Sequence, residues 1–98
     1  MEKRFYVYVL ASRPHGAIYI GMTNDLVRRV WEHKQGIVEG YTKRYRVKRL
    51  VYHEEHETAE AAIAREKRLK RWRRDWKDKL IEARNPDWRD LYDDIARP

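Results

Sequence analysis

Residues 4–22 have the sequence RFYVYVLASRPHGAIYIGM, which predicts a β-hairpin. Aromatic and β-branched residues alternate through residues 4–12 and return in residues 17–22, a pattern typical of strands with both faces covered. Between them Pro14 has a fixed φ and Gly16 accepts a positive φ, so a turn is expected at residues 13–16. The chain is therefore expected to begin with two paired strands.

A helix is predicted directly after this hairpin. Thr23, Asn24 and Asp25 form an N-cap cluster, residues 26–34 follow, and Gly36 stands where a glycine commonly ends a helix. A helical projection at about 100° per residue places the apolar side chains on one arc. The members of this arc are Leu26, Val27, Val30 and Trp31.

The middle of the chain predicts one more strand between polar segments. Residues 37–45 are expected to form a loop, and residues 47–53 alternate as a third strand. The charged run at residues 53–57 interrupts this pattern. Its two histidines and three glutamates admit a metal site, but a turn of solvated charges is the favoured interpretation.

The C-terminal half predicts helix. Residues 59–84 contain no Gly or Pro, so they form either one long helix or two helices with a bend near Trp72. Residues 85–98 are a tail that can dock Trp88, Leu91 and Tyr92 on the core. The order β-β-α-β-α(-α) predicts an α+β fold, a small three-stranded antiparallel sheet flanked by helices. One domain is expected over residues 1–98, with a core at about 4–84.

Composition limits the functions open to this chain. It has 98 residues and a net charge of +7, which suits an anionic partner such as nucleic acid. The absence of cysteine excludes disulfides, thiolate metal sites and a cysteine nucleophile. No apolar stretch approaches the roughly 18 residues of a membrane span, and the N-terminus has no signal-peptide pattern. We therefore expect a cytoplasmic protein without membrane association or a small organic cofactor.

Most of the positive charge lies in one helical stretch. Residues 65–79 hold nine cations against three carboxylates, interleaved with Trp72 and Trp76. This combination is expected of a surface that binds a phosphate backbone, and a solvated helix face is the alternative. The predicted nucleic-acid contacts are Arg28, Lys67, Lys70, Arg71, Arg73 and Arg74.

Three sets of residues have side chains suited to chemistry, and each also has a simpler interpretation. Glu66 falls inside the apolar arc of its helix, where it either pairs with an arginine or a tyrosine or binds Mg²⁺ or Mn²⁺. Arg29 and His33, at the edge of the first helical arc, form a surface pair or a phosphate clamp beside a proton acceptor. The strand tyrosines are ordinary packing residues by base rate.

Taken in order, several short motifs resemble the GIY-YIG endonuclease superfamily. They are Tyr6-Val7-Tyr8, Tyr19-Ile20-Gly21, Asn24-Asp25-Leu26 with Arg29 and His33, and Glu66 in a charged helix. The likeness is greatest to small single-domain bacterial members, and it extends through residues 65–72 and 85–88. The spacing carries the match, since Arg29 follows Tyr19 by ten residues and His33 follows Arg29 by four.

The resemblance implies the GIY-YIG fold and metal-dependent hydrolysis of phosphodiester bonds. It assigns catalytic roles to Tyr8, Tyr19, Arg29, His33 and Glu66, with Glu66 as the metal ligand. Tyr6 replaces the glycine of the first motif, which leaves the motif tyrosine in place. Many relatives have an asparagine about a dozen residues after the glutamate; this chain has Asp78 there and Asn85 further on, so that role is not transferred.

The chemistry of these residue types agrees with such a role. Arg29 supplies a permanent charge for the phosphate, and a divalent cation on Glu66 polarises it. Tyrosine has a pKa of about 10, so Tyr8 acts as a base only if cations lower that pKa or its proton passes to His33. We expect Tyr8 to be the base and Tyr19 to position water or phosphate, although the two are interchangeable on sequence grounds. The predicted function is a Mg²⁺- or Mn²⁺-dependent endonuclease on DNA, single-stranded or branched; a non-catalytic nucleic-acid-binding module and a protein-interaction domain are the alternatives.

Overall fold

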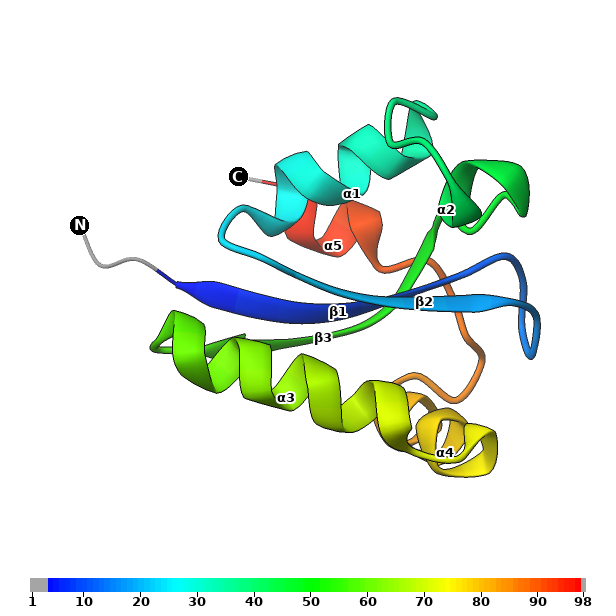
Figure 1. The fold of residues 1–98 in the computed structure, drawn as a ribbon. Helices are drawn as coiled ribbons and strands as arrows, with labels where there is room; N and C mark the ends of the chain where they lie inside the picture. Colours follow the sequence, from blue (N-terminus) through cyan, green and yellow to red (C-terminus); the bar gives the residue numbers. More distant parts are fainter. Residues whose placement is uncertain (1–3, 98) are drawn as a thin grey trace.

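The computed structural model describes residues 4–97, and Figure 1 shows a sheet between two layers of helices. Residues 1–3 and 98 of the expected domain lie outside the described residues. The elements, in chain order, are β1 (Phe5–Ala11), β2 (Ile18–Thr23), α1 (Leu26–Lys34), α2 (Tyr41–Arg44), β3 (Arg49–His56), α3 (Ala59–Arg71), α4 (Arg74–Arg84) and α5 (Tyr92–Ala96). The predicted antiparallel sheet flanked by helices is confirmed.

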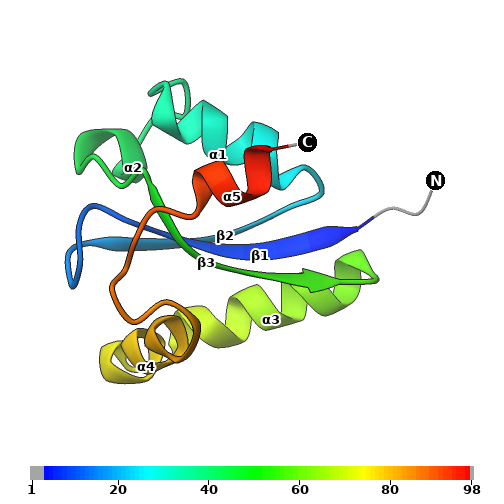
Figure 2. The same cartoon turned by 180° about the vertical axis from the view of Figure 1, so that it is seen from behind.

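The hairpin strand β1 is the centre of the sheet, whose strand order is β2-β1-β3. Both neighbours pair with it antiparallel, and Tyr8 lies opposite Gly21 on β2 and His53 on β3. Alternation along β1 sends Val7 and Val9 into one hydrophobic cluster and Tyr8 into another. Helices α3 and α4 cover the first face, and α1 and α5 cover the second (Figures 1 and 2). The prediction that both faces of this strand are covered is confirmed.

The hairpin turn differs from the expectation in one backbone angle. The N–H of Gly16 donates to the carbonyl of Arg13, and Ser12 and Ala17 close the strands. The positive φ falls on His15, at 59°, and not on Gly16. Glycine is needed at position 16 for space, because a Cβ there would lie 2.3 Å from the Ser12 hydroxyl oxygen.

The buried apolar face of α1 is narrower than predicted. Asp25 caps α1 by accepting from the Arg28 N–H at 3.2 Å, and Gly36 takes φ +71° just beyond its end. Leu26 and Val30 are buried, but Val27 and Trp31 are exposed. Only the strip of α1 that meets the sheet is covered, so the outer half of the arc faces solvent.

The charged run is not a turn. Strand β3 continues to His56, which pairs with Phe5, and the Glu54 carboxylate is held inside a network of side chains. Its Oε1 accepts a hydrogen bond from Tyr52 at 2.6 Å. Its Oε2 accepts from Arg65 at 3.0 Å and lies 2.6 Å from His56 Nε2. The expectation failed because a cation from α3, distant in sequence, compensates the carboxylate on the strand.

The helical segment divides in two, as the bent alternative predicts. Helix α3 ends at Arg71, the next residue Trp72 has an extended ψ of 149°, and α4 begins at Arg74. The rings of Trp72 and Trp76 meet edge to face, with centroids 6.0 Å apart. Residues 37–45, expected as a loop, contain the short helix α2. A helix of one turn has no hydrophobic period that a sequence pattern can reveal.

The tail docks along the outer edge of β3. Trp88 is buried, Leu91 donates its N–H to the carbonyl of Leu50, and Tyr92 begins α5. Asn85 is buried beneath a bulge in β3 and donates to the carbonyls of Val51 and Arg89. Within residues 4–97, no helix is long and apolar enough to cross a membrane.

Candidate functional site

The side chain of Tyr8 lies across Gly21 toward the free edge of β2. A Cβ at position 21 would lie 2.5 Å from the Tyr8 hydroxyl oxygen and 2.9 Å from the ring of Tyr19. The two tyrosine ring centroids are 6.3 Å apart. Gly21 therefore leaves the space that Tyr8 occupies. Sequence reasoning assigned Gly21 no role, although the hairpin register places it opposite Tyr8.

His33 connects this tyrosine pair to α2. Its Nε2 is 3.2 Å from the Tyr8 hydroxyl oxygen, and its Nδ1 is 2.9 Å from Oγ1 of Thr42. The ring centroid of Tyr19 lies 5.5 Å from that of His33. Both His33 and Thr42 are buried, so the chain of hydrogen bonds is shielded from water. Thr42 was not predicted as a site residue, because nothing in its local sequence links it to His33.

The protonation states follow from burial. Burial and the charge of Arg29 lower the pKa of His33, so its imidazole is neutral at neutral pH. Burial raises the pKa of Tyr8 to about 12, with a smaller contribution from Tyr19. The phenol is therefore protonated. The neutral imidazole carries one N–H, so Tyr8 either donates to Nε2 of His33 or accepts from it. When Tyr8 donates to Nε2, His33 donates from Nδ1 to Thr42, and Nε2 is ready to receive the tyrosine proton.

Arg29 reaches the same hydroxyl from α1. Through hydrogen bonding and charge it lowers the pKa of Tyr8, opposing burial. Burial alone would lower the pKa of Arg29, but hydrogen bonds to Tyr8 and Glu32 raise it above its ordinary value. Its Nη1 is 3.3 Å from the Glu32 carboxylate, and 41% of its side chain is exposed. The guanidinium is thus fixed in direction and open to an anion.

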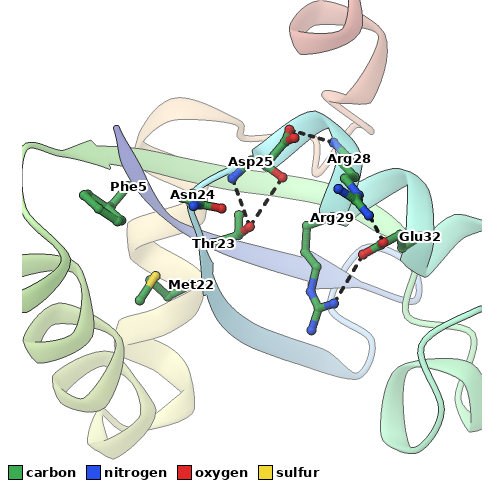
Figure 3. Close-up of a pocket in the computed structure, with 8 residues that line it drawn as sticks. All are labelled: Phe5, Met22, Thr23, Asn24, Asp25, Arg28, Arg29 and Glu32. Atoms are coloured by element: carbon green, nitrogen blue, oxygen red, sulfur yellow. Dashed lines mark hydrogen bonds and ion pairs between the residues drawn. The ribbon is translucent and has the colours of Figure 1, made fainter. Parts of the chain in front are cut away.

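An open pocket of about 580 Å³ adjoins Arg29 (Figure 3). Figure 3 shows Arg29 extending away from α1, with Glu32 turned back toward it. The Arg28 side chain is largely exposed and pairs with Glu32 at 3.5 Å. The lining residues are Phe5, Met22, Thr23, Asn24, Asp25, Arg28, Arg29 and Glu32. A chain segment bound at Arg29 therefore has room to continue past the end of β2.

Glu66 comes from α3, on the other face of the sheet. Its side chain is 21% exposed, and its carboxylate has Lys70 at 3.7 Å. Its charge also raises the pKa of Tyr8, but by less than burial and Tyr19 do. The structure therefore brings Tyr8, Tyr19 and His33 into contact, and Arg29 interacts with the Tyr8 hydroxyl. Glu66 comes from the helix layer on the opposite face.

The donor set fits a hard, oxygen-ligated cation such as Mg²⁺ or Mn²⁺ better than a softer metal such as Zn²⁺. Residues 4–97 contain no group of three or more His, Asp or Glu side chains arranged to hold a metal. A single partly exposed carboxylate suits Mg²⁺, which keeps several waters and completes its shell with substrate phosphate. The charged run of β3 does not supply an alternative metal site, because the Glu54 carboxylate already has Tyr52, His56 and Arg65 as hydrogen-bond partners.

The predicted nucleic-acid contacts differ in how free their charges are. Lys67 and Arg71 are exposed, and the described part of the chain holds no ion-pair partner for either. Arg73 pairs with Asp75 at 3.0 Å. Arg74 bonds Asp78 at 2.7 Å and the Gly16 carbonyl at 2.6 Å, so it also joins α4 to the hairpin.

Comparison with known proteins gives a consistent result. The profile of the GIY-YIG catalytic domain matches residues 4–79. A UPF0213 protein of Bacillus pumilus is 38% identical over 82 residues, 84% of each chain. A UPF0213 protein of Staphylococcus saprophyticus is 36% identical over 81 residues, 83% of this chain and 96% of the relative. The solution NMR structure of a UPF0213 protein from Bacillus halodurans superposes with a TM-score of 0.51 at 31% identity, covering 82% of this chain and 84% of the other.

Proposed function

Because this chain belongs to the GIY-YIG catalytic domain family, we propose that it is an endonuclease that hydrolyses phosphodiester bonds in DNA with the help of Mg²⁺ or Mn²⁺. The observation that carries the proposal is the buried contact between Tyr8 and His33, with Arg29 acting on the same hydroxyl. A module that only binds nucleic acid has no need of a proton acceptor behind a tyrosine that an arginine also reaches.

Arg29 binds the scissile phosphate in this mechanism. Its guanidinium is partly exposed, its charge is permanent, and Glu32 and Tyr8 fix its direction. A fixed cation beside the phosphate stabilises the charge that develops in the transition state and does not need to reorganise. Removal of one such group from a site of this kind lowers a rate by about 100- to 1,000-fold.

Tyr8 and His33 move the proton of the attacking water. With a pKa of about 12, Tyr8 is not a free phenolate at neutral pH. The phenol oxygen accepts the water proton as its own proton passes to Nε2 of His33, 3.2 Å away. Thr42 accepts from Nδ1 and orients the imidazole for this transfer. Tyr19, which packs against both rings, positions the water or the phosphate.

Glu66 is the residue that would hold the divalent cation. The bound cation would polarise the scissile phosphate and stabilise the departing 3′ oxygen. Glu66 can serve without other carboxylates because water and phosphate oxygens complete the shell of such an ion.

The basic surface holds the DNA backbone near this site. The set comprises Arg28, Lys67, Lys70, Arg71, Arg73 and Arg74. Lys67 and Arg71 contribute most because their charges are unpaired within residues 4–97, whereas Asp75 and Asp78 partly neutralise Arg73 and Arg74. Contacts of this kind carry no sequence information, so we expect little sequence preference.

The test is cleavage of labelled single-stranded, duplex and flap DNA with Mg²⁺ or Mn²⁺. Arg29→Ala and Glu66→Ala should each lower the rate by about 100-fold or more. Arg89→Ala is the matched control, because Arg89 is an exposed arginine that pairs with Asp94 in the tail. The mechanism is wrong if the purified protein cuts none of these substrates or if Glu66→Ala cuts as fast as the wild type. Binding without cleavage by the intact protein would support the binding-module alternative.

Two further variants distinguish the role of Tyr8 from that of Tyr19. Tyr8→Phe removes the transferable proton and keeps the ring, so the rate should fall at saturating substrate. Tyr19→Phe should have the smaller effect if Tyr19 only positions. The reverse order would exchange the two roles.

A further inference from the structure

Helix α2 presents aromatic side chains to solvent beside the candidate site. Tyr41 is 46% exposed and Tyr45 is 50% exposed, and their ring centroids are 5.0 Å apart with planes inclined by 50°. One helical turn separates them, so they share a face. Large aromatic rings left in water as a pair on a one-turn helix contribute little to the core, which receives only Thr42 from α2.

Positive charge surrounds these rings. The segment 39–48 has four cations and one carboxylate, and Glu39 pairs with Lys43 at 3.0 Å. The Arg44 guanidinium stacks over the Tyr45 ring, with its carbon 5.5 Å from the ring centroid. Arg46 is exposed, and it has no ion-pair partner in the described part of the chain. We refer to Tyr41, Arg44, Tyr45 and Arg46 as the α2 platform.

Arg46 occupies a position that favours glycine. Its φ is +56°, in the left-handed region, where the turn after α2 leads into buried Val47. Glycine adopts this angle without the steric cost that a side chain incurs. The backbone geometry therefore does not require arginine, and the exposed guanidinium is free to bind an external anion.

One residue, Thr42, connects the α2 platform to the candidate proton acceptor His33. Thr42, between Tyr41 and the rest of α2, is buried and lies 2.9 Å from Nδ1 of His33. A ligand on the outer side of α2 therefore lies one helix away from the proton acceptor. A shallow pocket of about 690 Å³ on this surface is lined by residues 39–41 and 43–45.

We propose that the α2 platform binds single-stranded nucleic acid, with Tyr41 and Tyr45 stacking on unpaired bases and Arg44 and Arg46 contacting the adjoining phosphates. The inference rests on the proposed nuclease function and specifies its substrate as an unpaired strand. Aromatic faces interleaved with arginine are the usual platform for single strands, because every base has a π-face that pairing in a duplex hides. Charge complementarity favours this occupant over an apolar protein surface, which would leave the arginines unpaired.

The test measures binding in EDTA, so that cleavage cannot occur. Fluorescence anisotropy of a labelled single-stranded oligonucleotide and of the matching duplex is compared for the wild type, Tyr41→Ala/Tyr45→Ala and Tyr41→Phe/Tyr45→Phe. If the tyrosines stack on bases, the double alanine variant should bind the single strand about tenfold or more weakly than the wild type. The double phenylalanine variant should have a single-strand affinity within about twofold of the wild type. Duplex affinity should change by less than about twofold.

Arg46→Gly tests the phosphate contact without straining the backbone. Its melting temperature should not fall, because glycine accepts the positive φ. Single-strand affinity should fall, and the slope of log affinity against log salt should decrease by about 0.7, the value for one phosphate contact. An unchanged slope would remove Arg46 from the interface.

The outcomes distinguish this inference from the proposed function. Unchanged single-strand affinity in the double alanine variant, or an equal loss of affinity for duplex, overturns the platform, and the first result would leave a protein partner as the alternative occupant. If that variant also cleaves DNA at the wild-type rate, the nuclease proposal stands alone. If the wild type binds single strands through the platform but never cleaves them with Mg²⁺ or Mn²⁺, the platform stands and the nuclease proposal fails.

Discussion

The hydroxyl of Tyr8 occupies the space where a side chain at position 21 would begin. Gly21→Ala should therefore displace the Tyr8 ring, since its Cβ would lie 2.6 Å from the ring carbon that bears the hydroxyl. We expect the free energy of unfolding to fall by about 1–3 kcal/mol, as for other overpacked sites. Cleavage should fall by at least about tenfold, because small displacements of reacting groups are costly. Urea unfolding and a cleavage assay measure the two effects.

A double-mutant cycle supplies the control for Gly21. In the Tyr8→Ala background the two closest contacts of the added methyl group are gone and only the Tyr19 ring, at 2.9 Å, remains, so Gly21→Ala should cost less than in the wild type. An equal cost in both backgrounds would show that the contact with Tyr8 is not the cause.

His33 gives the protein a pH dependence whose sign is fixed by its burial. The pKa of His33 is lowered from about 6.5, so below that pH the unfolded chain binds a proton that the folded chain does not. The free energy of unfolding should therefore decrease between pH 7.5 and 5.5. Glu54, whose lowered pKa matters only below about pH 4.5, does not contribute in this window.

Urea unfolding of His33→Gln at the two pH values isolates this effect. The decrease should be smaller than in the wild type, and His53→Gln measures the separate contribution of the other histidine whose pKa burial lowers. A wild type that is more stable at pH 5.5, or a His33→Gln variant with the full pH dependence, contradicts the assignment.

At the scale of elements, Asn85 joins the end of α4 to the bulge of β3. Its amide donates to the carbonyls of Val51 at 3.1 Å and Arg89 at 2.9 Å, and its oxygen accepts from the Arg89 N–H. Asn85→Ala should lower the free energy of unfolding by about 3 kcal/mol, because it leaves buried backbone groups without partners. Asn24→Ala, at an exposed asparagine, should cost less than about 0.5 kcal/mol. Cleavage per folded molecule should remain at the wild-type level, and a loss of rate in a stable Asn85→Ala protein would instead indicate a role in the reaction.

The elements that the sequence predicted are those with strong local signals. The hairpin, α1 and the division near Trp72 follow from alternation, capping residues and composition. The end of β3 was missed because Glu54 is compensated by Arg65, a contact between elements that no local pattern contains. Within the candidate site, Tyr8, Tyr19, Arg29, His33 and Glu66 were predicted from motif spacing, and their roles stay predictions. Thr42 was not predicted, because its role depends on how α2 folds back onto His33.

At the scale of the whole molecule, the candidate site is built from both layers of helices. Arg29 and His33 come from α1 on one face of the sheet, and Glu66 comes from α3 on the other (Figures 1 and 2). The two layers can cooperate because β2 is an edge strand and Gly21 leaves its surface open to Tyr8. Under the proposed function, the free edge of the sheet is the place where a phosphate would approach these groups.

The cationic side chains behind the net charge of +7 are of two kinds: those that form ion pairs within the fold and those that remain available to a ligand. Arg74 belongs to the first kind, since it bonds Asp78 and the Gly16 carbonyl, and Arg71 belongs to the second. Arg71→Gln should weaken DNA binding and reduce the salt slope on duplex by about 0.9, with stability changed by less than about 0.5 kcal/mol. Arg74→Gln should lower the free energy of unfolding by about 1 kcal/mol, because it breaks a charged hydrogen bond at a partly exposed position, and it should reduce the slope by less than Arg71→Gln does, because Asp78 partly neutralises Arg74. Anisotropy titrations across salt concentrations measure the slope, and urea unfolding measures the stability. A larger loss of slope in Arg74→Gln than in Arg71→Gln would show that ion pairing within the fold does not decide which cations reach the DNA.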